Sequence, residues 1–438
     1  MNRAPFILNF IFFLVCLFLN LVIDWNPPKW VEYSDPEDYI AQSKMSLLDK
    51  EFYSPHQKGV FFPRPFTVPL FYKMGGSNPV LIVQMQKYIH SLSTFFLVYA
   101  LLLIFNRQIL QYLAIFFIYF LMSWWNILGW SIQILSESLS ISLFFCWLAS
   151  FLILWKKRGW FFLLVHMIIT ILFSFTRDTW PYMIVAFYLF SAVYFYFIEK
   201  ILFRKLLFLL GFSLILFMVQ QQTVLTGTRY RLAMINTITV RILSNPAYTA
   251  WFVAHGMPCT DSLVNQYNHI DVNVDADRHK IWDVYYNPKY RELSQWISTK
   301  GRGVYFRFMM THPAYFLLFT ESKDQRRRIL SSNLWYTGDV RGYSRLSEYI
   351  FPVFRPISIL LGCLSLIVIF FRKRGPFLFF PVLLSLVLLL NVFLSYNADA
   401  LEVERHLFIT MIVIQFIGFL SVTMILDVLL PDPVMDHS

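Results

Sequence analysis

Long apolar stretches constrain the fold of this chain more than any other feature of its sequence. A helix that crosses a bilayer needs ~20 predominantly apolar residues. The ten stretches that meet this requirement are 5–23, 84–105, 109–128, 136–155, 160–176, 181–198, 206–224, 351–371, 376–395 and 406–426. Because helices satisfy their backbone hydrogen bonds internally in lipid, the sequence predicts an all-α polytopic membrane protein with about ten transmembrane helices.

The composition excludes the main soluble classes. Of the 438 residues, 57% are hydrophobic and only 14% are charged. Soluble domains carry roughly 25% charged residues, and a soluble protein of this size needs a charged surface that this chain does not supply. A soluble enzyme, a disordered chain and a fibrous repeat are therefore excluded, the lipid bilayer is an expected partner, and no nucleic-acid partner is expected.

Basic residues in the short connections predict the orientation. They follow the second, fourth, sixth and eighth stretches, at Arg107, 156–158, 200–205 and 372–374. Short cytoplasmic loops carry an excess of Lys and Arg, so both termini are predicted to be cytoplasmic. The short inner loops and the lack of Asn-x-Ser/Thr glycosylation sites favour a bacterial inner (plasma) membrane over the endoplasmic reticulum.

Two long segments, 24–83 and 225–350, are predicted to lie outside the membrane as large extracytoplasmic loops with short helices. The predicted organisation is a membrane module at 1–224 that includes the first loop, an extracytoplasmic region at 225–350, and C-terminal transmembrane helices at 351–438. Residues 303–322 are almost long enough to cross, but crossing would place Arg307, His312 and Pro313 in lipid. We therefore interpret 303–322 as an interfacial helix.

The first loop holds the strongest candidate site. Asp35, Pro36, Glu37 and Asp38 follow each other, and Pro36 suits the first turn of a helix that Ser34 or Asp35 caps. The alternative is an ordinary surface helix with solvated acids. A proline-stiffened aromatic segment at 61–72 carries Arg64, and such a segment favours a fixed shape over a simple connection.

Three more charged groups are predicted at the same side of the membrane. Glu137 opens the fourth stretch, either as a functional acid or as a residue that suits the helix dipole. Arg177 lies beside Asp178 between the fifth and sixth stretches, where the alternative is a surface ion pair of little energetic value. Arg405 lies at the start of the last stretch. The scarce charge of the chain is therefore sorted: basic residues mark the predicted inner connections, while the acids at 35–38, 137 and 402–404 gather on the predicted outer side.

Several of these motifs together resemble the GT-C superfamily of membrane glycosyltransferases, in particular the mannosyltransferase and aminoarabinose-transferase-like group. The resemblance covers mainly residues 1–200 and is carried by Asp35, Tyr39, Ala41, the stretch Arg64 to Tyr72, Gln84, and Ser136 with Glu137. It implies a GT-C-like fold, a catalytic Asp in the first outer loop and a polyprenyl-phosphate-linked sugar donor. The implied acceptor is a lipid, a glycan or a protein.

The chemistry of such a transfer suggests a role for each charged residue. A carboxylate takes the proton of the acceptor hydroxyl, and we expect Asp35 to be this base, with Asp38 as the alternative. Glu137 would orient the acceptor or the sugar. Arginines hold the leaving phosphate, and the candidates are Arg64, Arg177 and Arg405. The acids read Asp-Pro-Glu-Asp where some subfamilies have a closer pair, so the need for a divalent metal stays open and no cofactor is certain.

Two other functions compete with this hypothesis. A lipid-linked polysaccharide polymerase or ligase would use histidines or arginines of the second loop, such as His255, His269, Arg278 or His279. A transporter or flippase predicts polar residues inside the spans and matching internal repeats. We find neither feature in the sequence. The stretches divide seven and three around the second loop, so the chain has no matching halves.

Overall fold

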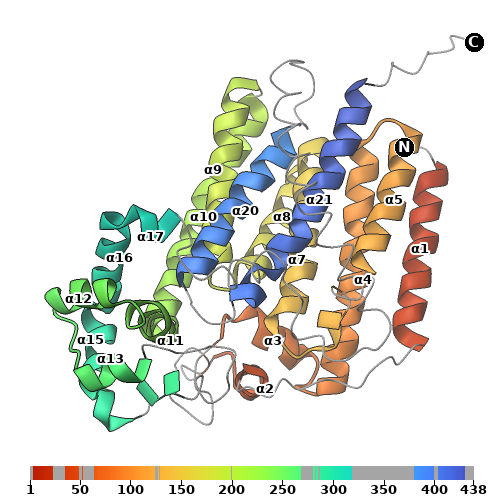
Figure 1. The fold of residues 1–438 in the computed structure, drawn as a ribbon. Helices are drawn as coiled ribbons and strands as arrows, with labels where there is room; N and C mark the ends of the chain where they lie inside the picture. Colours follow the sequence, from red (N-terminus) through yellow and green to blue (C-terminus); the bar gives the residue numbers. More distant parts are fainter. Residues whose placement is uncertain are drawn as a thin grey trace, which may run out of the picture. The chain divides into compact units, whose positions relative to one another are not determined.

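A computed structural model describes the helices of this chain and the connections that position them (Figure 1). The described residues are 3–22, 35–48, 52, 64–123, 127, 129–198, 200–267, 280–281, 283–284, 287–317, 379–398 and 403–429. Over these ranges the regular elements are all helices, which confirms the all-α class for the described part of the chain. The chain divides into two compact units. Unit 1 is Met1–Thr226, Leu334–Leu390 and Ile409–Ser438, and unit 2 is Gly227–Asn333 and Asn391–Phe408.

Nine of the ten predicted spans fall on apolar helices of the described part. These helices are α1 (Arg3–Val22), α4 (Pro79–Ile104), α5 (Gln108–Met122), α7 (Ser136–Lys157), α8 (Trp160–Ser174), α9 (Trp180–Ile198), α10 (Lys200–Thr226), α20 (Phe379–Ala398) and α21 (Val403–Leu429). Five of them, α4, α7, α9, α10 and α20, are long and apolar enough to cross a membrane. The predicted span at 351–371 lies outside the described residues. The chain is thus a helical membrane protein, and the full number of spans stays a prediction.

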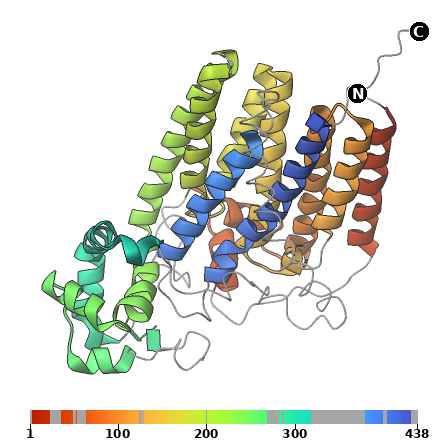
Figure 2. The ribbon, with the colours of Figure 1, turned by 45° about the horizontal axis from the view of Figure 1, so that its top comes forward.

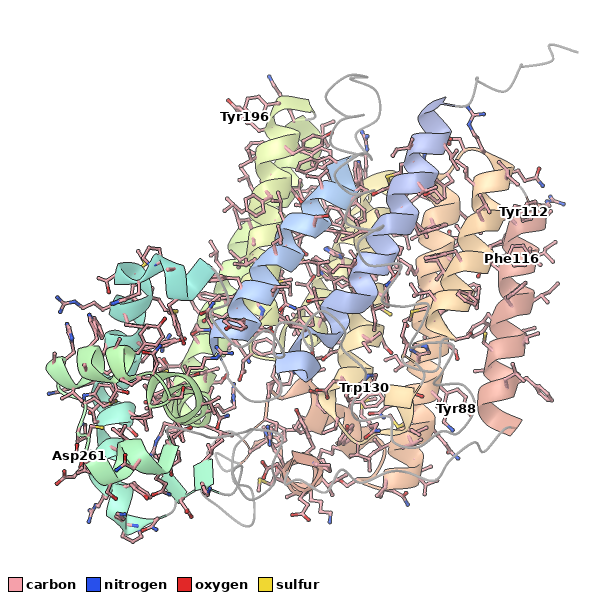
Figure 3. All side chains as sticks on the ribbon, viewed as in Figure 1. Tyr88, Tyr112, Phe116, Trp130, Tyr196 and Asp261 are labelled. Atoms are coloured by element: carbon pink, nitrogen blue, oxygen red, sulfur yellow. The ribbon has the colours of Figure 1, made fainter. Side chains whose placement is uncertain are left out.

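Helix α7 lies at the centre of the unit 1 bundle. It packs against α4 and α8, while α1 and α5 pack beside α4, and α10 packs on α9 (Figures 1 and 2). Of an apolar 18-residue stretch in each helix, 89% is buried in α7, whereas 28% is buried in α10. Large side chains such as Phe116 and Tyr196 point outward from the bundle (Figure 3). An apolar helix that exposes this much surface is suited to contact with lipid.

Helix α5 is shorter than predicted, because it ends at Met122 rather than at 128. The chain then forms a 3-10 turn, η2 (Gly129–Ile132), whose Trp130 is buried. The side chain of Gln86 on α4 donates to the carbonyl oxygens of Ser131 and Gln133, at 3.0 and 2.8 Å. These bonds satisfy carbonyl groups of the turn, so Gln86 holds in place the turn that follows α5.

The bundle has two chemically different ends. At one end lie the basic connections: Arg107 donates to Asp427 at 3.1 Å, and Lys205 donates to the carbonyl oxygen of Arg158. At the other end lie two short helices, α2 (Asp35–Lys44) and α3 (Thr67–Met74) (Figures 1 and 2). Helix α2 has Pro36 in its first turn, as predicted. This second end holds the candidate site.

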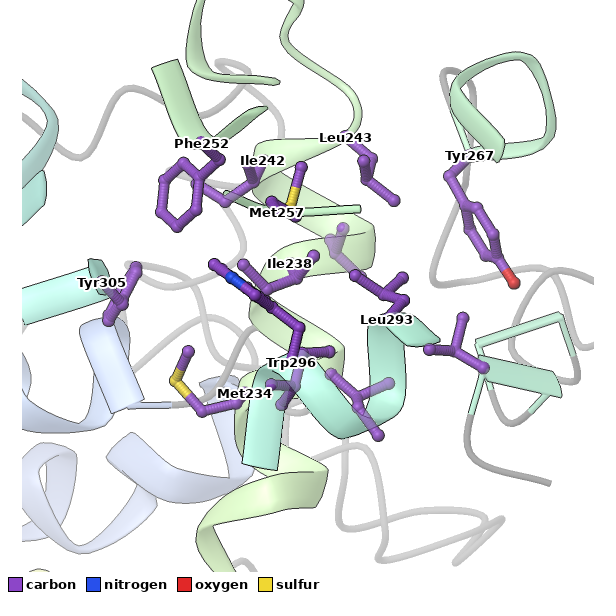
Figure 4. Close-up of a cluster of buried hydrophobic side chains, with 14 of the residues drawn as sticks. Met234, Ile238, Ile242, Leu243, Phe252, Met257, Tyr267, Leu293, Trp296 and Tyr305 are labelled. Atoms are coloured by element: carbon purple, nitrogen blue, oxygen red, sulfur yellow. The ribbon is translucent and has the colours of Figure 1, made fainter. Parts of the chain in front are cut away.

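Unit 2 has its own hydrophobic core, formed by short helices. They are α11 (Tyr230–Thr237), η3 (Ile238–Ile242), α12 (Pro246–Ala254), α13 (Asp261–Tyr267), η4 (Pro288–Tyr290), α15 (Arg291–Trp296), η5 (Ile297–Gly301), α16 (Arg302–Thr311) and α17 (Pro313–Leu317). Its members include Ile238, Phe252, Trp296 and Tyr305, whose side chains gather from several of these helices (Figure 4). The helix α16 ends before His312, and Pro313 starts a new helix. The described part of 303–322 is therefore not one continuous helix, and 318–322 lies outside the described residues.

Candidate functional site

The first pair of charges joins helix α2 to the segment before α3. Asp38 is fully buried, and its Oδ2 lies 2.9 Å from Nη2 of Arg64, which is 17% exposed. The Arg64 guanidinium also lies 5.3 Å from the ring centroid of Tyr39, the next residue along α2. Removing a carboxylate from water is costly unless it is paired and hydrogen-bonded. The burial of Asp38 is therefore made possible by Arg64.

Helix α2 also fixes the backbone of Arg64. Gln42 follows Asp38 by one helical turn, so both side chains project from the same face of the helix. The Gln42 Oε1 accepts from the backbone N–H of Arg64 at 2.7 Å, and its Nε2 donates to the Arg64 carbonyl at 3.1 Å. One face of α2 thus holds Arg64 by its backbone and by its guanidinium.

A second pair joins the start of α7 to the connection between α8 and α9. Glu137 is fully buried in the first turn of α7, where the helix dipole favours a negative charge. Its Oε1 lies 3.6 Å from Nη2 of Arg177, which is 11% exposed. The hydroxyl of Ser136 donates to Glu137 Oε2 at 3.3 Å. The side chain of Arg177 is therefore largely buried and reaches a buried carboxylate.

The two pairs are linked by Tyr72 of α3. Its hydroxyl lies 3.0 Å from the carbonyl oxygen of Leu135, two residues before Glu137, and donates there or to Gln86 Oε1 at 3.2 Å. Its ring packs edge-on against Tyr39 at 5.9 Å, next to Asp38. Tyr72 thus contacts both the helix that carries the first acid and the residues that lead into the second.

A backbone contact links the two arginines. The N–H of Thr67 donates to the carbonyl oxygen of Phe175 at 3.2 Å. The rings of Phe66 and Phe175 pack at 4.5 Å between centroids. Because Phe66 follows Arg64 by two residues and Phe175 precedes Arg177 by two, the arginine-bearing segments run side by side. We refer to Asp38, Arg64, Glu137 and Arg177 together as the acid–arginine site.

Two predicted residues are not placed in this site. The backbone of Asp35 begins α2, but its side chain lies outside the described residues. The backbone of Arg405 lies in the first turn of α21, in a segment that groups with unit 2, and its side chain also lies outside the described residues. The alternative of a surface helix with solvated acids fits Glu37, which is exposed. It does not fit Asp38, which is buried.

Sequence reasoning missed two residues that build the site. Gln84 attracted notice in the sequence, but it is exposed, and Gln86 is the buried side chain that binds Tyr72 and the η2 turn. Tyr72 was only part of an aromatic run. A polar side chain inside an apolar helix is a signal that could have identified Gln86. Nothing in the sequence distinguished Tyr72 from its aromatic neighbours.

The acid–arginine site thus contains two fully buried carboxylates and two largely buried guanidinium groups. The guanidinium group of arginine binds carboxylates and phosphates alike, and a carboxylate can accept a proton or a hydrogen bond from a hydroxyl group. Within the described ranges no group of three or more His, Cys, Asp or Glu side chains is suited to hold a metal ion. The guanidinium of Arg64 lies against the Asp38 carboxylate.

Comparisons with known proteins do not identify the chain. No family model matches the sequence, no curated protein matches it, and no solved structure matches its fold. The function is therefore inferred from the residues of the acid–arginine site.

Proposed function

We propose that this protein is a membrane glycosyltransferase of the GT-C type. It transfers a hexose or pentose from a polyprenyl-phosphate-linked donor to a lipid, glycan or protein acceptor. The proposed location is a bacterial inner membrane, with both termini in the cytoplasm and the acid–arginine site on the extracytoplasmic face. The observation that carries the proposal is the pairing of two buried acids with two arginines at one end of an apolar helix bundle.

The proposed reaction replaces the phosphate on the sugar with the acceptor oxygen. A bond forms between the acceptor oxygen and the anomeric carbon, and the bond from that carbon to the phosphate oxygen breaks. The electron pair of the broken bond leaves with the polyprenyl phosphate, and the hydroxyl proton passes to a carboxylate. The step therefore needs a base on one side of the sugar and positive charge at the leaving phosphate.

The residues of the acid–arginine site match these needs. Asp38 is the favoured base, because its buried carboxylate is positioned by Arg64 at 2.9 Å. Arg177 and Arg64 are the favoured phosphate contacts, since guanidinium groups recognise phosphate oxygens in two-pronged hydrogen bonds. Glu137 holds Arg177 and orients the acceptor or the sugar. Asp35 stays the alternative base and Arg405 an additional phosphate candidate.

The location of the site supports a lipid-linked donor. The site lies at the end of apolar helices, so a phosphate headgroup can reach the arginines while its polyprenyl chain stays in the bilayer. In contrast, transporter sites lie near the bilayer midplane. The buried His166 of α8 is hydrogen-bonded to Ser150 of α7 and Tyr188 of α9. This placement favours chemistry at the membrane surface over passage through the membrane.

The test is transfer from a defined donor. The full-length protein is purified in nanodiscs, bound lipids are identified by mass spectrometry, and the protein is then given a polyprenyl-phosphate-linked sugar. We expect a sugar-loaded polyprenyl phosphate to copurify and the added donor to be consumed. Consumption of the donor by a double variant, Asp35→Asn with Asp38→Asn, at the wild-type rate would contradict the proposal.

A variant in the second loop separates the rival function. His255 stacks on Trp251 at 3.7 Å and its Nδ1 lies 2.7 Å from the Trp251 carbonyl oxygen. A polymerase or ligase that uses second-loop histidines would lose activity in His255→Ala and keep it in the Asp double variant. We expect the opposite pattern. The other rival residues, 269, 278 and 279, lie outside the described residues.

A further inference from the structure

Helix α16 of unit 2 exposes an apolar strip with an arginine on either side. Phe306 is 61% exposed and Met310 is 67% exposed. At about 100° per residue, these two side chains share one face of the helix, with exposed Arg302 on one border and exposed Arg307 on the other. The sequence of α16 contains no acidic residue. Such an arrangement is typical of a helix that lies on a membrane surface.

The opposite face of α16 fixes its position within unit 2. Tyr305 and Phe308 are buried there in the hydrophobic core (Figure 4). The hydroxyl of Tyr305 donates to the carbonyl oxygen of Asn397 at 3.0 Å. Asn397 is the last residue of the candidate span Phe379–Asn397 on α20. Because the end of a span lies at the boundary between lipid and water, this bond sets α16 at the depth of that boundary.

A second contact supports the same depth. Arg241 of η3 is buried, its Nη1 donates to the carbonyl oxygen of Tyr396, and its guanidinium lies 4.0 Å from the ring centroid of Tyr396. Residues on two different helices of unit 2 thus hold the same end of α20. Unit 2 therefore carries part of its own membrane anchor, and α16 is attached directly to it.

We propose that α16 docks on the bilayer surface and binds the phosphate groups of anionic phospholipids. Phe306 and Met310 enter the boundary between headgroups and acyl chains, while Arg302 and Arg307 extend to the phosphates on either side. This inference goes beyond the proposed sugar transfer and does not depend on it. It assigns unit 2 a lipid contact of its own, separate from the acid–arginine site.

The charge pattern favours lipid over a second copy of the chain. Two copies that met through this face would bring arginines against arginines with no acid on α16 to compensate them, and like charges at an interface are costly. An anionic lipid surface instead offers a counter-charge to every basic residue. Exposed Lys300, just before α16, adds to the basic border.

The test labels lipid contacts on the wild-type, full-length protein. The protein is placed in nanodiscs of phosphatidylcholine, with or without phosphatidylglycerol, that contain a phospholipid with a photoreactive diazirine near its headgroup. After illumination, labelled peptides are identified by mass spectrometry. We expect strong labelling of 302–311 and little labelling of α13, which exposes Asp261, Ser262 and Asn265. Equal labelling of the two helices, or a crosslink from α16 to a second copy, would overturn the proposal.

Variants test the two parts of the surface separately. Phe306→Ser with Met310→Ser is expected to reduce the labelling of α16 in both lipid mixtures. Arg302→Gln and Arg307→Gln are each expected to reduce the preference for phosphatidylglycerol about fivefold, which corresponds to ~1 kcal/mol per basic residue. The matched control is Arg291→Gln, an exposed arginine on α15. An equal reduction in this control, or no reduction in any arginine variant, would show that α16 does not read lipid charge.

Discussion

Two buried polar groups in unit 1 both include residues of α7 but differ in chemistry. The first is the acid–arginine site. The second, which we call the His166 network, consists of neutral side chains inside the bundle. His166 Nδ1 lies 2.7 Å from Ser150 Oγ and its Nε2 lies 2.6 Å from the hydroxyl of Tyr188. Tyr188 is in turn 3.2 Å from both Thr170 Oγ1 and Trp147 Nε1.

The comparison is informative because α7 carries residues of both groups, and α8 carries His166 and leads to Arg177. Ser150 and Glu137 are both on α7, about 20 Å apart at 1.5 Å per residue. His166 lies on α8, and Arg177 follows the end of that helix. In the His166 network, neutral donors and acceptors satisfy each other, which is how polar side chains join helices in a membrane. At the acid–arginine site, buried full charges are kept at a cost that packing does not require. The difference indicates that charge, rather than burial or polarity, marks the functional site.

The largest effect is expected for the base. Asp38→Asn keeps the shape of the side chain but removes the proton acceptor, so the transfer rate is expected to fall about 10²–10⁴-fold, the usual contribution of general base catalysis. Asp35→Asn is the matched control and is expected to retain a rate close to wild type. The measurement is donor consumption per folded protein in nanodiscs. If Asp35→Asn abolished transfer and Asp38→Asn did not, the roles of the two acids would be reversed.

The second pair distinguishes a catalytic role from a structural one. Glu137→Gln or Arg177→Gln alone leaves a buried charge without its partner and is expected to destabilise the protein by roughly 3–5 kcal/mol. The double variant removes both charges and is expected to recover most of that stability. Transfer is expected to stay about 10²–10³-fold below wild type in all three variants, because the proposed phosphate contact Arg177 is absent from two of them and has lost its positioning partner in Glu137→Gln. Thermal unfolding and turnover are measured on the same samples, and recovery of both in the double variant would indicate a purely structural pair.

A smaller effect is expected at the link between the two pairs. Tyr72→Phe keeps the ring packed against Tyr39 but removes the hydroxyl that reaches Leu135 and Gln86. Loss of one such bond costs about 0.5–1.5 kcal/mol, so transfer is expected to fall severalfold. Tyr88→Phe is the control, because Tyr88 is 40% exposed on the neighbouring helix α4 (Figure 3). A similar decrease in both variants would remove Tyr72 from the site.

The sequence predicted the membrane class and most helices because apolar length is a local property. It also selected Asp38, Arg64, Glu137 and Arg177, since charge is rare in this chain and each of these residues lies in the predicted first outer loop or at a predicted outer span end. What it did not predict is which charges meet. Arg177 was considered with its neighbour Asp178, whereas its described ion pair is with Glu137, 40 residues away in the chain. Pairing of this kind depends on helix packing, which no local pattern encodes.

Two further misses have the same origin. The importance of Gln86 over Gln84 depends on which face of α4 turns inward, and this is set by contact with η2. The early end of α5 is followed by that same η2 turn, which Gln86 binds from a neighbouring helix. Both outcomes are tertiary effects that override a simple count of apolar residues. In contrast, the break at Pro313 is local, and the sequence interpretation of 303–322 already relied on that proline.

The last prediction tests the neutral side of the comparison. His166→Leu removes the contacts of the imidazole with Ser150 and Tyr188, and hydrogen bonds between membrane helices contribute about 0.6 kcal/mol each on average and up to about 1.7. We expect a loss of stability of ~1–2 kcal/mol, seen as a lower unfolding temperature, with transfer per folded protein unchanged. Ser150→Ala, which removes only one contact, is expected to give a smaller loss of stability. If His166→Leu lowered transfer as strongly as Arg177→Gln while the protein stayed folded, the neutral network would itself belong to the functional site, and charge would no longer separate the two groups.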